Sequence, residues 1–332
     1  MPRDTDVELE QRVRLCVVGN LLIDVILRGV AAMPGWGQEV VCSSRLEVVA
    51  GQGPNLALAA SRLGVSTGLI GNVGKDAAGS RIRRELEEAG IQIERVETSP
   101  GGSTAMTIAL VRLDGERAFL SDLGCLKDFD GAAMARSWSV ACDAQVVALV
   151  GSSNLPSLDL EQAARMFAQA RECGTVTVFD PGWDPYGWQP ATLKGIAAVL
   201  AQTEIFLPNQ DEAAALTQQD DVRLMLRALA EWCPGVVVIK CGAAGSWCLR
   251  QGDVFRVDPL PAEVDNAVGA GDVYDAGVIA GYLSSGDVLE GMIVGTAAAS
   301  LYVSRRSSRF PELRETMALK DKVLVSHERL AR

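Results

Sequence analysis

The stretch NAVGAGD, residues 266–272, runs directly into VYDAGVIAGYL, residues 273–283. The second part has the pattern of an amphipathic helix with small residues on its packing faces, and the first part predicts a glycine turn where that helix starts. A helix start offers free backbone N–H groups and a partial positive charge, which attract phosphate or a developing anion. The carboxylate of Asp272 stands beside this start, where it can accept a proton from a nucleophile that attacks the phosphate. The stretch therefore indicates phosphoryl transfer.

The same residues also have a purely structural explanation. Asp is a common N-cap residue of helices, and Gly-Ala-Gly occurs in ordinary tight turns. The rest of the chain decides between the two interpretations.

The composition predicts one large globular domain with a smaller appendage. The chain has 332 residues, of which 48% are hydrophobic, and this is enough for a large core. Its net charge of −11 argues against a nucleic-acid partner, because proteins that bind nucleic acids present a basic stripe. No apolar run reaches about 18 residues, and the polar start of the chain lacks the apolar region of a signal peptide. We therefore expect a cytoplasmic enzyme with no membrane partner.

Cysteine and histidine usage narrows the chemistry. None of the eight cysteines forms a C-x-x-C pair, so we expect buried reduced thiols and neither disulfides nor a zinc site. The single histidine, His327, lies in a charged tail that we expect to be helical and solvated. A catalytic triad, a Cys-His pair or a His-rich metal site would each need this residue. Acid–base chemistry is therefore expected to fall to carboxylates or lysine.

Apolar runs of strand length alternate with helical patterns along most of the chain. This order is typical of an α/β domain with a mainly parallel sheet, in which ligands bind at the carboxyl ends of the strands. The expected strands are 13–19, 68–73, 146–150, 176–179, 205–207 and 236–239. The expected helices are 77–89, 159–172, 211–216 and 222–232, besides the one that follows the glycine turn.

Two segments depart from this pattern, residues 39–49 and 103–122. Both alternate polar and apolar residues, and the second contains Asp114-Gly115, a hairpin turn signal. They predict antiparallel strands of a small sheet beside the main domain. The pattern alone fits a lid over the site and an ordinary edge hairpin equally well.

Two common nucleotide-binding motifs are excluded by their spacing. The segment 68–76 resembles a P-loop, but Leu69 stands where a glycine is required and Asp76 where Ser or Thr is required. The G-x-G turns that start at Gly51 and Gly269 both lack the third glycine of a dinucleotide fingerprint. Neither a P-loop NTPase nor an NAD-dependent dehydrogenase is supported.

The remaining motifs follow one another in a specific order. It runs from Gly19-Asn20 and Asp24 through AGQGPN (50–55), G-x-x-G-x-D-x-x-G (71–79), NQDE (209–212) and KCGAAG (240–245) to residues 266–272. This succession resembles the ribokinase-like, or PfkB-type, family of carbohydrate and nucleoside kinases, over roughly residues 13–311. Two glycine-rich elements in this order, with an N-x-x-E between them, make the resemblance specific.

The resemblance implies a fold and a domain organisation. We expect a three-layer α/β/α fold with a mainly parallel central sheet and a small antiparallel β-lid. The kinase domain would span residues 13–315, with lid segments 37–50 and 100–124 inserted in it, and residues 316–332 would form a C-terminal helical tail. In relatives the lid can also serve as a dimer clasp, so we expect a homodimer formed through the lid.

The resemblance also implies roles for individual residues. Asp272 matches the catalytic base, and Gly269, Ala270 and Gly271 match the anion hole that faces the transferred phosphate. The positions that match substrate-binding residues are Asp24, Gly51, Gly53 and Asn55. The positions that match nucleotide-binding residues are Asn209, Lys240, Gly242, Gly245 and Asn266. Asn209 and Glu212 match the element that organises Mg²⁺ and phosphate.

Several of these positions keep a structural alternative. Asp24 could be a turn residue, and Asn55 could be the N-cap of a helix over 56–63. Asn209 and Glu212 could form a plain capping box. These alternatives lose weight when the motifs are taken together in their order.

Two departures from the family pattern affect the expected ligands. Asn266 stands where the family usually has Asp, which puts a site for a monovalent cation in doubt. The expected cofactors are therefore ATP and Mg²⁺, with K⁺ as an open candidate. In the first glycine turn, Gln52 and Pro54 replace residues that include a lysine in several relatives, and this loss of charge argues against a phosphorylated sugar as substrate.

Other side chains are candidates for contacts with the substrate. Arg45, Arg112 or Arg117 could supply a positive charge in place of the missing lysine. Trp36, Trp183 and Trp188 are candidates for stacking on a sugar or a base, and ordinary packing explains them equally well.

We expect an ATP-dependent kinase that phosphorylates a primary hydroxyl of a small neutral sugar or sugar acid. A nucleoside kinase of the same family is the alternative, and a non-catalytic sugar-binding regulator is a third hypothesis. Asp272 and the glycine turn favour an enzyme, because a binding protein does not need the base.

Overall fold

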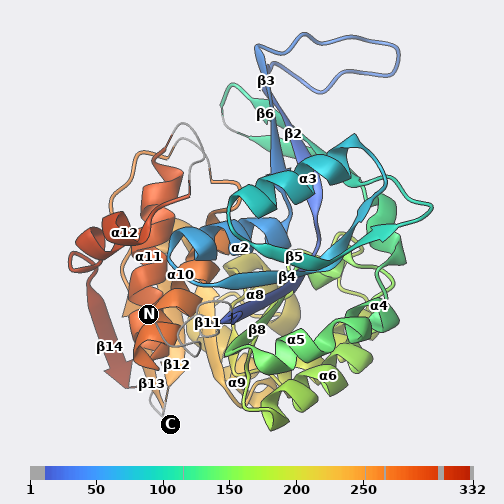
Figure 1. Ribbon diagram of the computed structural model, residues 1–332. Coiled ribbons are helices and arrows are strands. Elements are labelled where there is room, and N and C mark those ends of the chain that lie inside the picture. Colours follow the sequence, from blue (N-terminus) through green and yellow to red (C-terminus); the bar gives the residue numbers. More distant parts are fainter. Residues whose placement is uncertain (1–11, 115, 251, 265–266, 306–309, 330–332) are drawn as a thin grey trace, which may run out of the picture.

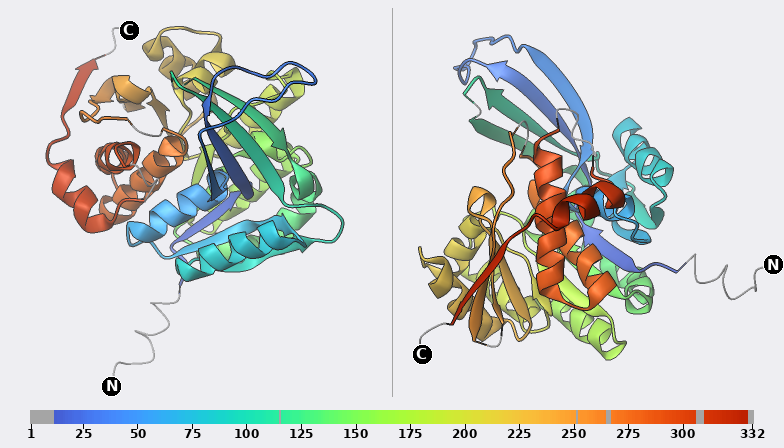
Figure 2. Two further views of the ribbon diagram at one scale, coloured as in Figure 1. Left: turned by 90° about the horizontal axis from the view of Figure 1, so that it is seen from above. Right: turned by 90° about the vertical axis from the view of Figure 1, so that its left-hand side faces the viewer.

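The computed structural model describes residues 12–114, 116–250, 252–264, 267–305 and 310–329. Its main body has three layers, with helices on both sides of a central sheet, and a smaller sheet projects from one edge of that body (Figures 1 and 2). The predicted fold class is confirmed.

The central sheet has ten strands in the order β14-β13-β12-β11-β10-β9-β8-β1-β4-β5. Within this order, the neighbouring strands β11, β10, β9, β8, β1, β4 and β5 run parallel. At the other edge, β12, β13 and β14 extend the sheet with antiparallel pairing. The parallel strands are short apolar runs because both faces of the sheet are covered. The strands are β1 (Leu15–Gly19), β4 (Thr67–Gly74), β5 (Gln92–Ser99), β8 (Val146–Val150), β9 (Val176–Asp180), β10 (Ile205–Phe206), β11 (Val236–Lys240), β12 (Ser246–Arg250), β13 (Asp253–Val257) and β14 (Val325–Arg329).

Helices cover both faces and enclose one hydrophobic core on each side of the sheet. One face carries α2 (Gln52–Arg62), α3 (Ala77–Glu88), α10 (Ala270–Ser285), α11 (Val288–Val303) and α12 (Leu313–Lys320). The other face carries α4 (Gly131–Arg136), α5 (Trp138–Asp143), α6 (Leu160–Glu172), α7 (Pro190–Leu200), α8 (Gln210–Thr217) and α9 (Val222–Trp232). Within the described ranges, no helix has both the length and the apolar content that crossing a bilayer requires.

The small sheet contains one strand that the sequence pattern did not reveal. Its order is β3-β2-β6-β7, from β2 (Leu22–Val30), β3 (Ser44–Ala50), β6 (Ala105–Arg112) and β7 (Arg117–Asp122). The pairs β2–β3 and β6–β7 are antiparallel, and the two central strands, β2 and β6, are parallel. The strand expected over 39–49 begins only at Ser44, and the missed strand β2 carries Asp24. The small sheet therefore carries Asp24, one of the predicted substrate-binding residues.

The C-terminal tail is helical only in its first part. α12 ends at Lys320, and Val325–Arg329 pairs antiparallel with β13 as an edge strand of the central sheet (Figure 1). The prediction of a helical tail over 316–332 was therefore wrong for residues 325–329. His327 lies in this strand, and its ring stacks on Phe255 with 5.6 Å between centroids. A short strand at a free sheet edge is stabilised by pairing, which periodicity does not show.

The helix that follows the glycine turn is buried on nearly all sides, and it is not amphipathic as the sequence suggested. α10 packs along α11, and small residues at the contact allow the two backbones to approach closely. A Cβ atom on Gly277 would lie 2.5 Å from the Cα atom of Gly295, so a larger residue cannot fit there. This packing fixes the direction and position of the start of α10.

Candidate active site

Two glycine-rich helix starts meet above the carboxyl edge of the parallel strands. α2 begins after Gly51, and α10 begins after Gly269. Asn55, in the first turn of α2, donates a hydrogen bond from Nδ2 to Oδ2 of Asp272 over 2.8 Å. Asn55 is therefore not the N-cap of its helix, because Gly51 holds that position. The contact joins two motifs that are 217 residues apart in the sequence.

The turn before α10 presents backbone N–H groups at the site. Gly269 has φ 79°, a left-handed conformation that favours glycine. The first helical hydrogen bond runs from the N–H of Val273 to the carbonyl of Gly269, and the N–H of Ala270 donates to the carbonyl of Ala267 over 3.3 Å. The N–H groups of Gly271 and Asp272 precede the first helical bond, as the first groups of a helix do. This geometry suits an anion.

Asp272 is buried in the first turn of α10, and its surroundings favour the protonated carboxyl. Burial raises the pKa of Asp272 to about 7, against the hydrogen bond from Asn55 and the charge of Lys240, while the Asp180 carboxylate adds to the rise. A carboxylate whose pKa lies near neutrality can accept a proton at neutral pH without a large cost in free energy. Asp272 therefore has the properties of a general base.

A buried ion cluster lies directly behind Asp272. Lys240, the last residue of β11, places Nζ 2.8 Å from Oδ2 of Asp180 at the end of β9. The same Nζ lies 3.0 Å from both carboxylate oxygens of Asp275, one turn after Asp272 on α10. Lys240 was predicted as a nucleotide-binding position, whereas Asp180 and Asp275 were not predicted. Two features of the sequence pointed to them: Asp180 directly follows the predicted strand 176–179, and Asp275 follows Asp272 at helical spacing.

Asn209 and Glu212 form a reciprocal capping box at the start of α8. The Asn209 side chain accepts from the N–H of Glu212 over 2.9 Å, and Oε2 of Glu212 accepts from the N–H of Asn209 over 2.8 Å. The structural alternative for these two residues is thus present in the molecule. Burial raises the pKa of Glu212 to about 8, and the neighbouring Asp180 contributes.

The donor set around Asp272 is suited to Mg²⁺. Asp180, Glu212, Asp272 and Asp275 bring carboxylate oxygens to one region, and Mg²⁺ prefers oxygen ligands. Within the described ranges, no group of three Asp, Glu, His or Cys side chains could hold a metal ion by itself. In nucleotide sites one or two carboxylates hold Mg²⁺ together with phosphate oxygens and water, so a protein cage is not required.

A cavity of about 520 Å³ opens beside the glycine turn. Lys240, Gly242, Gly245, Ala270 and Gly271 line it together with a mostly apolar wall. The wall includes Pro259, Leu260, Pro261, Ala262, Val264, Thr296, Ala299 and Val303. The apolar wall suits a planar ring and the glycine turn suits phosphate. The structure thus brings the predicted nucleotide-binding residues Lys240, Gly242 and Gly245 to one cavity, whereas Asn266 lies outside the described residues.

A second cavity, of about 180 Å³, lies on the other side of Asn55. Asp24 and Asn55 line it together with Arg81, Glu85 and an apolar wall that includes Ile26, Val48, Leu58 and Phe310. Asp24 lies within β2, so it is not a turn residue, and burial raises its pKa to about 6. Gly51 and Gly53, at the start of α2, do not line this cavity and lie close to the backbone of Asn20.

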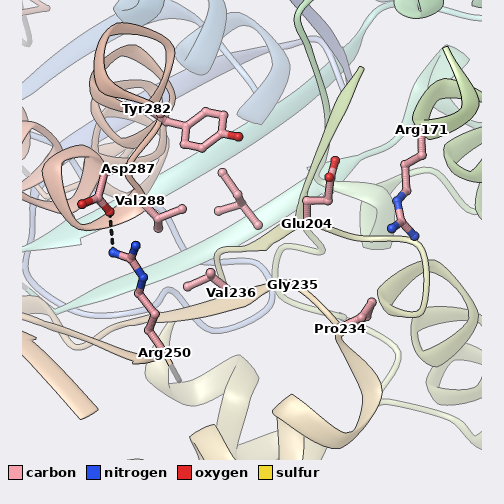
Figure 3. Close-up of a pocket in the computed structure, with 11 residues that line it drawn as sticks. Arg171, Glu204, Pro234, Gly235, Val236, Arg250, Tyr282, Asp287 and Val288 are labelled. Carbon is pink, nitrogen blue, oxygen red and sulfur yellow. Dashed lines mark hydrogen bonds and ion pairs between the residues drawn. The ribbon is translucent and has the colours of Figure 1, made fainter. Parts of the chain in front are cut away.

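A third cavity, of about 340 Å³, lies at the opposite, amino edge of the parallel strands (Figure 3). The start of β11, the end of β12 and the link between α10 and α11 line it. Arg250 and Asp287 form an ion pair of 2.8 Å there, and Figure 3 also labels Arg171, Glu204 and Tyr282. None of the predicted site residues lines this cavity.

The tryptophan candidates do not line the cavity beside the glycine turn or the cavity beside Asp24. Trp36 is fully exposed on the link between β2 and β3. Trp183 and Trp188 contact each other edge to face, with 5.7 Å between ring centroids. All eight cysteines are free, and most are partly or fully buried, whereas Cys173 is exposed.

The chain belongs to the pfkB family of carbohydrate kinases, whose sequence pattern matches residues 13–315. This family, together with its kinase-named relatives, identifies the protein as a phosphotransferase that acts on an alcohol group of a sugar-like substrate. ATP is the usual phosphate donor in this family.

Several named relatives match most of the chain. An "ATP-dependent ribose-1-phosphate kinase" of Halopiger xanaduensis is 28% identical over 90% of this chain and 94% of its own length. A "nucleoside kinase" of Methanothermobacter thermautotrophicus is 28% identical over 87% and 89% of the two chains. A "5-dehydro-2-deoxygluconokinase" of Geobacillus kaustophilus is 30% identical over 78% and 80%.

Solved structures show the same fold. Arabidopsis thaliana ribokinase, in complex with ribose and ATP, superimposes with a TM-score of 0.78 at 22% identity, over 93% of this chain and 99% of the other. A putative ribokinase II from E. coli, in complex with ATP and Mg²⁺, gives a TM-score of 0.79 at 20% identity, over 93% and 99%.

Proposed function

We propose that the protein transfers the γ-phosphoryl group of ATP to a hydroxyl of a small sugar or sugar acid, with Asp272 as the base. One observation carries this proposal: Asp272 is joined to a residue that lines each of the two cavities. Gly271, its neighbour in the chain, lines the larger cavity, and Asn55, its hydrogen-bond partner, lines the smaller one. A base in this position can reach an alcohol on one side while phosphate binds on the other.

The proposed reaction is a direct displacement at phosphorus. The substrate hydroxyl oxygen forms a bond with the γ-phosphorus while its proton passes to the carboxylate of Asp272. The bond from the γ-phosphorus to the bridging oxygen breaks, and ADP leaves with that oxygen. Gly269, Ala270 and Gly271 form the anion hole, where backbone N–H groups stabilise the charge on the transferred group. Asp272 then releases its proton to solvent.

Asn209, Lys240, Gly242 and Gly245 would hold the nucleotide, and Asn209 with Glu212 would position Mg²⁺ through water and phosphate. Bound Mg²⁺ neutralises charge on the β- and γ-phosphates. K⁺ stays a candidate activator, and replacing KCl by tetramethylammonium chloride in the assay tests it. We place the enzyme in the cytoplasm, where its eight free cysteines would stay reduced.

The small cavity supports an uncharged substrate of sugar size more than a phosphorylated one. Asp24 and Glu85 contribute carboxylates, and the Arg81 guanidinium is already paired with Glu85 over 2.7 Å. Arg45 and Arg112 form ion pairs on the lid, with Glu47 and Asp114, and do not line this cavity. A phosphate group would therefore meet more negative than positive charge.

A panel of sugars, sugar acids, sugar phosphates and nucleosides, assayed for ADP release with ATP and Mg²⁺, tests the proposal. We expect turnover with a free sugar or sugar acid and its loss in Asp272→Asn. Turnover only with nucleosides would assign the alternative activity that the relative from Methanothermobacter carries in its name. No turnover with any member, despite binding of a sugar, would favour the non-catalytic regulator.

We also propose a homodimer formed through the lid. Leu46, Ile26, Ala109 and Phe119 stand side by side across the four strands, and Leu46 and Phe119 are 40% and 54% exposed. Asp24 lies two residues before Ile26 and so faces the same side of the sheet. A second copy on this face would cover both apolar residues and the substrate. Light scattering should give twice the monomer mass for the wild type and the monomer mass for Phe119→Asp, and a monomeric wild type would refute the dimer.

A further inference from the structure

The ion cluster behind Asp272 joins three separate elements of the fold. Asp180 ends β9, Lys240 ends β11, and Asp275 lies on α10. Their side chains are 3%, 11% and 1% exposed, and every contact of the cluster lies between 2.8 and 3.0 Å. Lys240 is thus held from two sides by carboxylates that water hardly reaches.

Lys240 keeps its charge within the cluster. Burial raises the pKa of Asp275, whereas the neighbouring Lys240 and hydrogen bonds outweigh burial and lower the pKa of Asp180. Burial lowers the pKa of Lys240, but Asp180 and Asp275 more than reverse this, so Lys240 stays charged. The ammonium therefore has a carboxylate partner in Asp180 over 2.8 Å.

The ammonium of Lys240 lies beneath the proposed anion hole. A Cβ atom placed on Gly271 would be only 3.6 Å from Nζ of Lys240, and both residues line the larger cavity. The backbone of Lys240 is fixed as well, because its N–H donates to the carbonyl of Pro208 over 2.9 Å. The ammonium therefore occupies a defined position on the side of the site where phosphate would bind.

Stability alone does not account for such a cluster. Taking charges out of water is costly, and replacing buried ion pairs with apolar residues of similar size is often neutral or stabilising. A rigidly placed ammonium next to an anion site, in contrast, contributes most where negative charge develops during a reaction.

We propose that Asp180 and Asp275 are positioning residues that hold the Lys240 ammonium beneath the glycine turn, where it stabilises the phosphoryl group during transfer. This inference rests on the proposed kinase function. Lys240 contacts the nucleotide side of the site, and the two carboxylates act through Lys240.

The decisive variant removes the ionisable groups of all three residues together: Asp180→Asn, Lys240→Met and Asp275→Asn in one protein. No unpaired charge is then left in the interior, so the fold should persist, with a melting temperature close to that of the wild type. The matched control is Arg250→Met with Asp287→Asn, which removes the ion pair at the opposite edge and keeps a residue that can cap α11. We expect kcat of the triple variant to fall about 10²–10³-fold, with the KM for the sugar changed less than about threefold. The control should keep its kcat.

A second readout does not depend on turnover. Calorimetric titration should show that the triple variant binds a non-hydrolysable ATP analogue about tenfold more weakly, whereas its affinity for ADP changes less than about threefold. A merely structural role would weaken both nucleotides alike or neither. A folded triple variant that keeps kcat within about threefold, or that loses ADP and ATP-analogue affinity equally, overturns the inference.

The single variant Asp275→Asn covers the case in which the triple variant fails to fold. It leaves the contact of 2.8 Å between Lys240 and Asp180 but frees one side of the ammonium. We expect about a tenfold fall in kcat, with the KM for the sugar unchanged, and an unchanged kcat would overturn the role of Asp275. If the wild type shows no turnover in the substrate panel, the proposed function fails. If the wild type turns over and these variants keep the wild-type kcat, the proposed function stands and only the inference fails.

Discussion

The two edges of the central sheet both carry cavities and ion pairs, but the charged side chains are buried at one edge and exposed at the other. At the carboxyl edge, Lys240 pairs with Asp180 and Asp275, and the side chains of both carboxylates are almost completely buried. At the amino edge, Arg250 and Asp287 pair over the same distance, 2.8 Å, with both side chains 42% exposed (Figure 3). Water and salt screen the exposed pair, whereas a buried charge acts strongly on its neighbours. Burial of charge, and not a cavity as such, therefore marks the site.

The largest effect is expected from Asp272→Asn at the carboxyl edge. Asn keeps the size of the side chain and an oxygen that can accept from Asn55, but it cannot serve as the base. We expect kcat to fall about 10²–10⁴-fold with little change in the KM for the sugar. Steady-state kinetics and a melting curve, measured in parallel, separate this loss from unfolding. A variant with more than a third of the wild-type kcat would remove Asp272 from the role of base.

A pair of glycine substitutions at the two ends of α10 sharpens the comparison. Gly269 and Gly286 flank this helix with φ of 79° and 74°, so alanine is strained at both positions by about 1–2 kcal/mol. A Cβ atom on Gly269 would meet Asn55 Nδ2 at 3.1 Å and the Tyr302 hydroxyl at 3.2 Å, whereas nothing lies within 4 Å of one on Gly286.

We expect both alanine variants to melt at lower temperature and only Gly269→Ala to lose kcat, by about tenfold or more, because it moves the turn against Asn55. Equal effects of Gly269→Ala and Gly286→Ala on kcat would show that the turn is not part of the site.

The contrast between these regions was only partly predictable from the sequence. Short apolar strands and the helix start at Ala270 are local patterns, so β8, α9 and the order of layers follow from periodicity and turn residues. β14 was predicted as helix because its short polar sequence carries no local strand signal, and pairing with β13 decides it. The ion cluster joins residues 180, 240 and 275, and only the folded sheet brings these three together. Contacts between residues so far apart in the sequence produce no periodic pattern from which they could be predicted.

A smaller effect is expected at the lid, which supplies one wall of the substrate cavity. Asp24→Ala removes a carboxylate that can accept hydrogen bonds from sugar hydroxyls, and such charge-assisted bonds contribute about 1.5–3 kcal/mol. The KM for the sugar should therefore rise roughly 10–100-fold, while the KM for ATP stays the same. The matched control is Asp114→Ala, near the lid tip, where Asp114 pairs with the exposed side chain of Arg112. Equal losses for sugar and ATP would contradict the placement of Asp24.

The smallest effect is expected at the amino edge. Arg250→Met with Asp287→Asn removes an exposed ion pair, which contributes about 0–1 kcal/mol to stability. Kinetic constants for both substrates should stay within about twofold of the wild type. A tenfold loss of kcat would mean that this edge communicates with the site and would break the distinction drawn between the two edges.

The pH dependence of kcat/KM tests most directly whether Asp272 is the base. A base must be deprotonated to act, and the pKa of Asp272 is raised by burial to about 7, so activity should be low at pH 5 and rise through pH 7 to a plateau. The slope on the acid side should approach tenfold per pH unit. A profile that stays flat between pH 5 and 9 in an active, folded enzyme would contradict the assignment of Asp272.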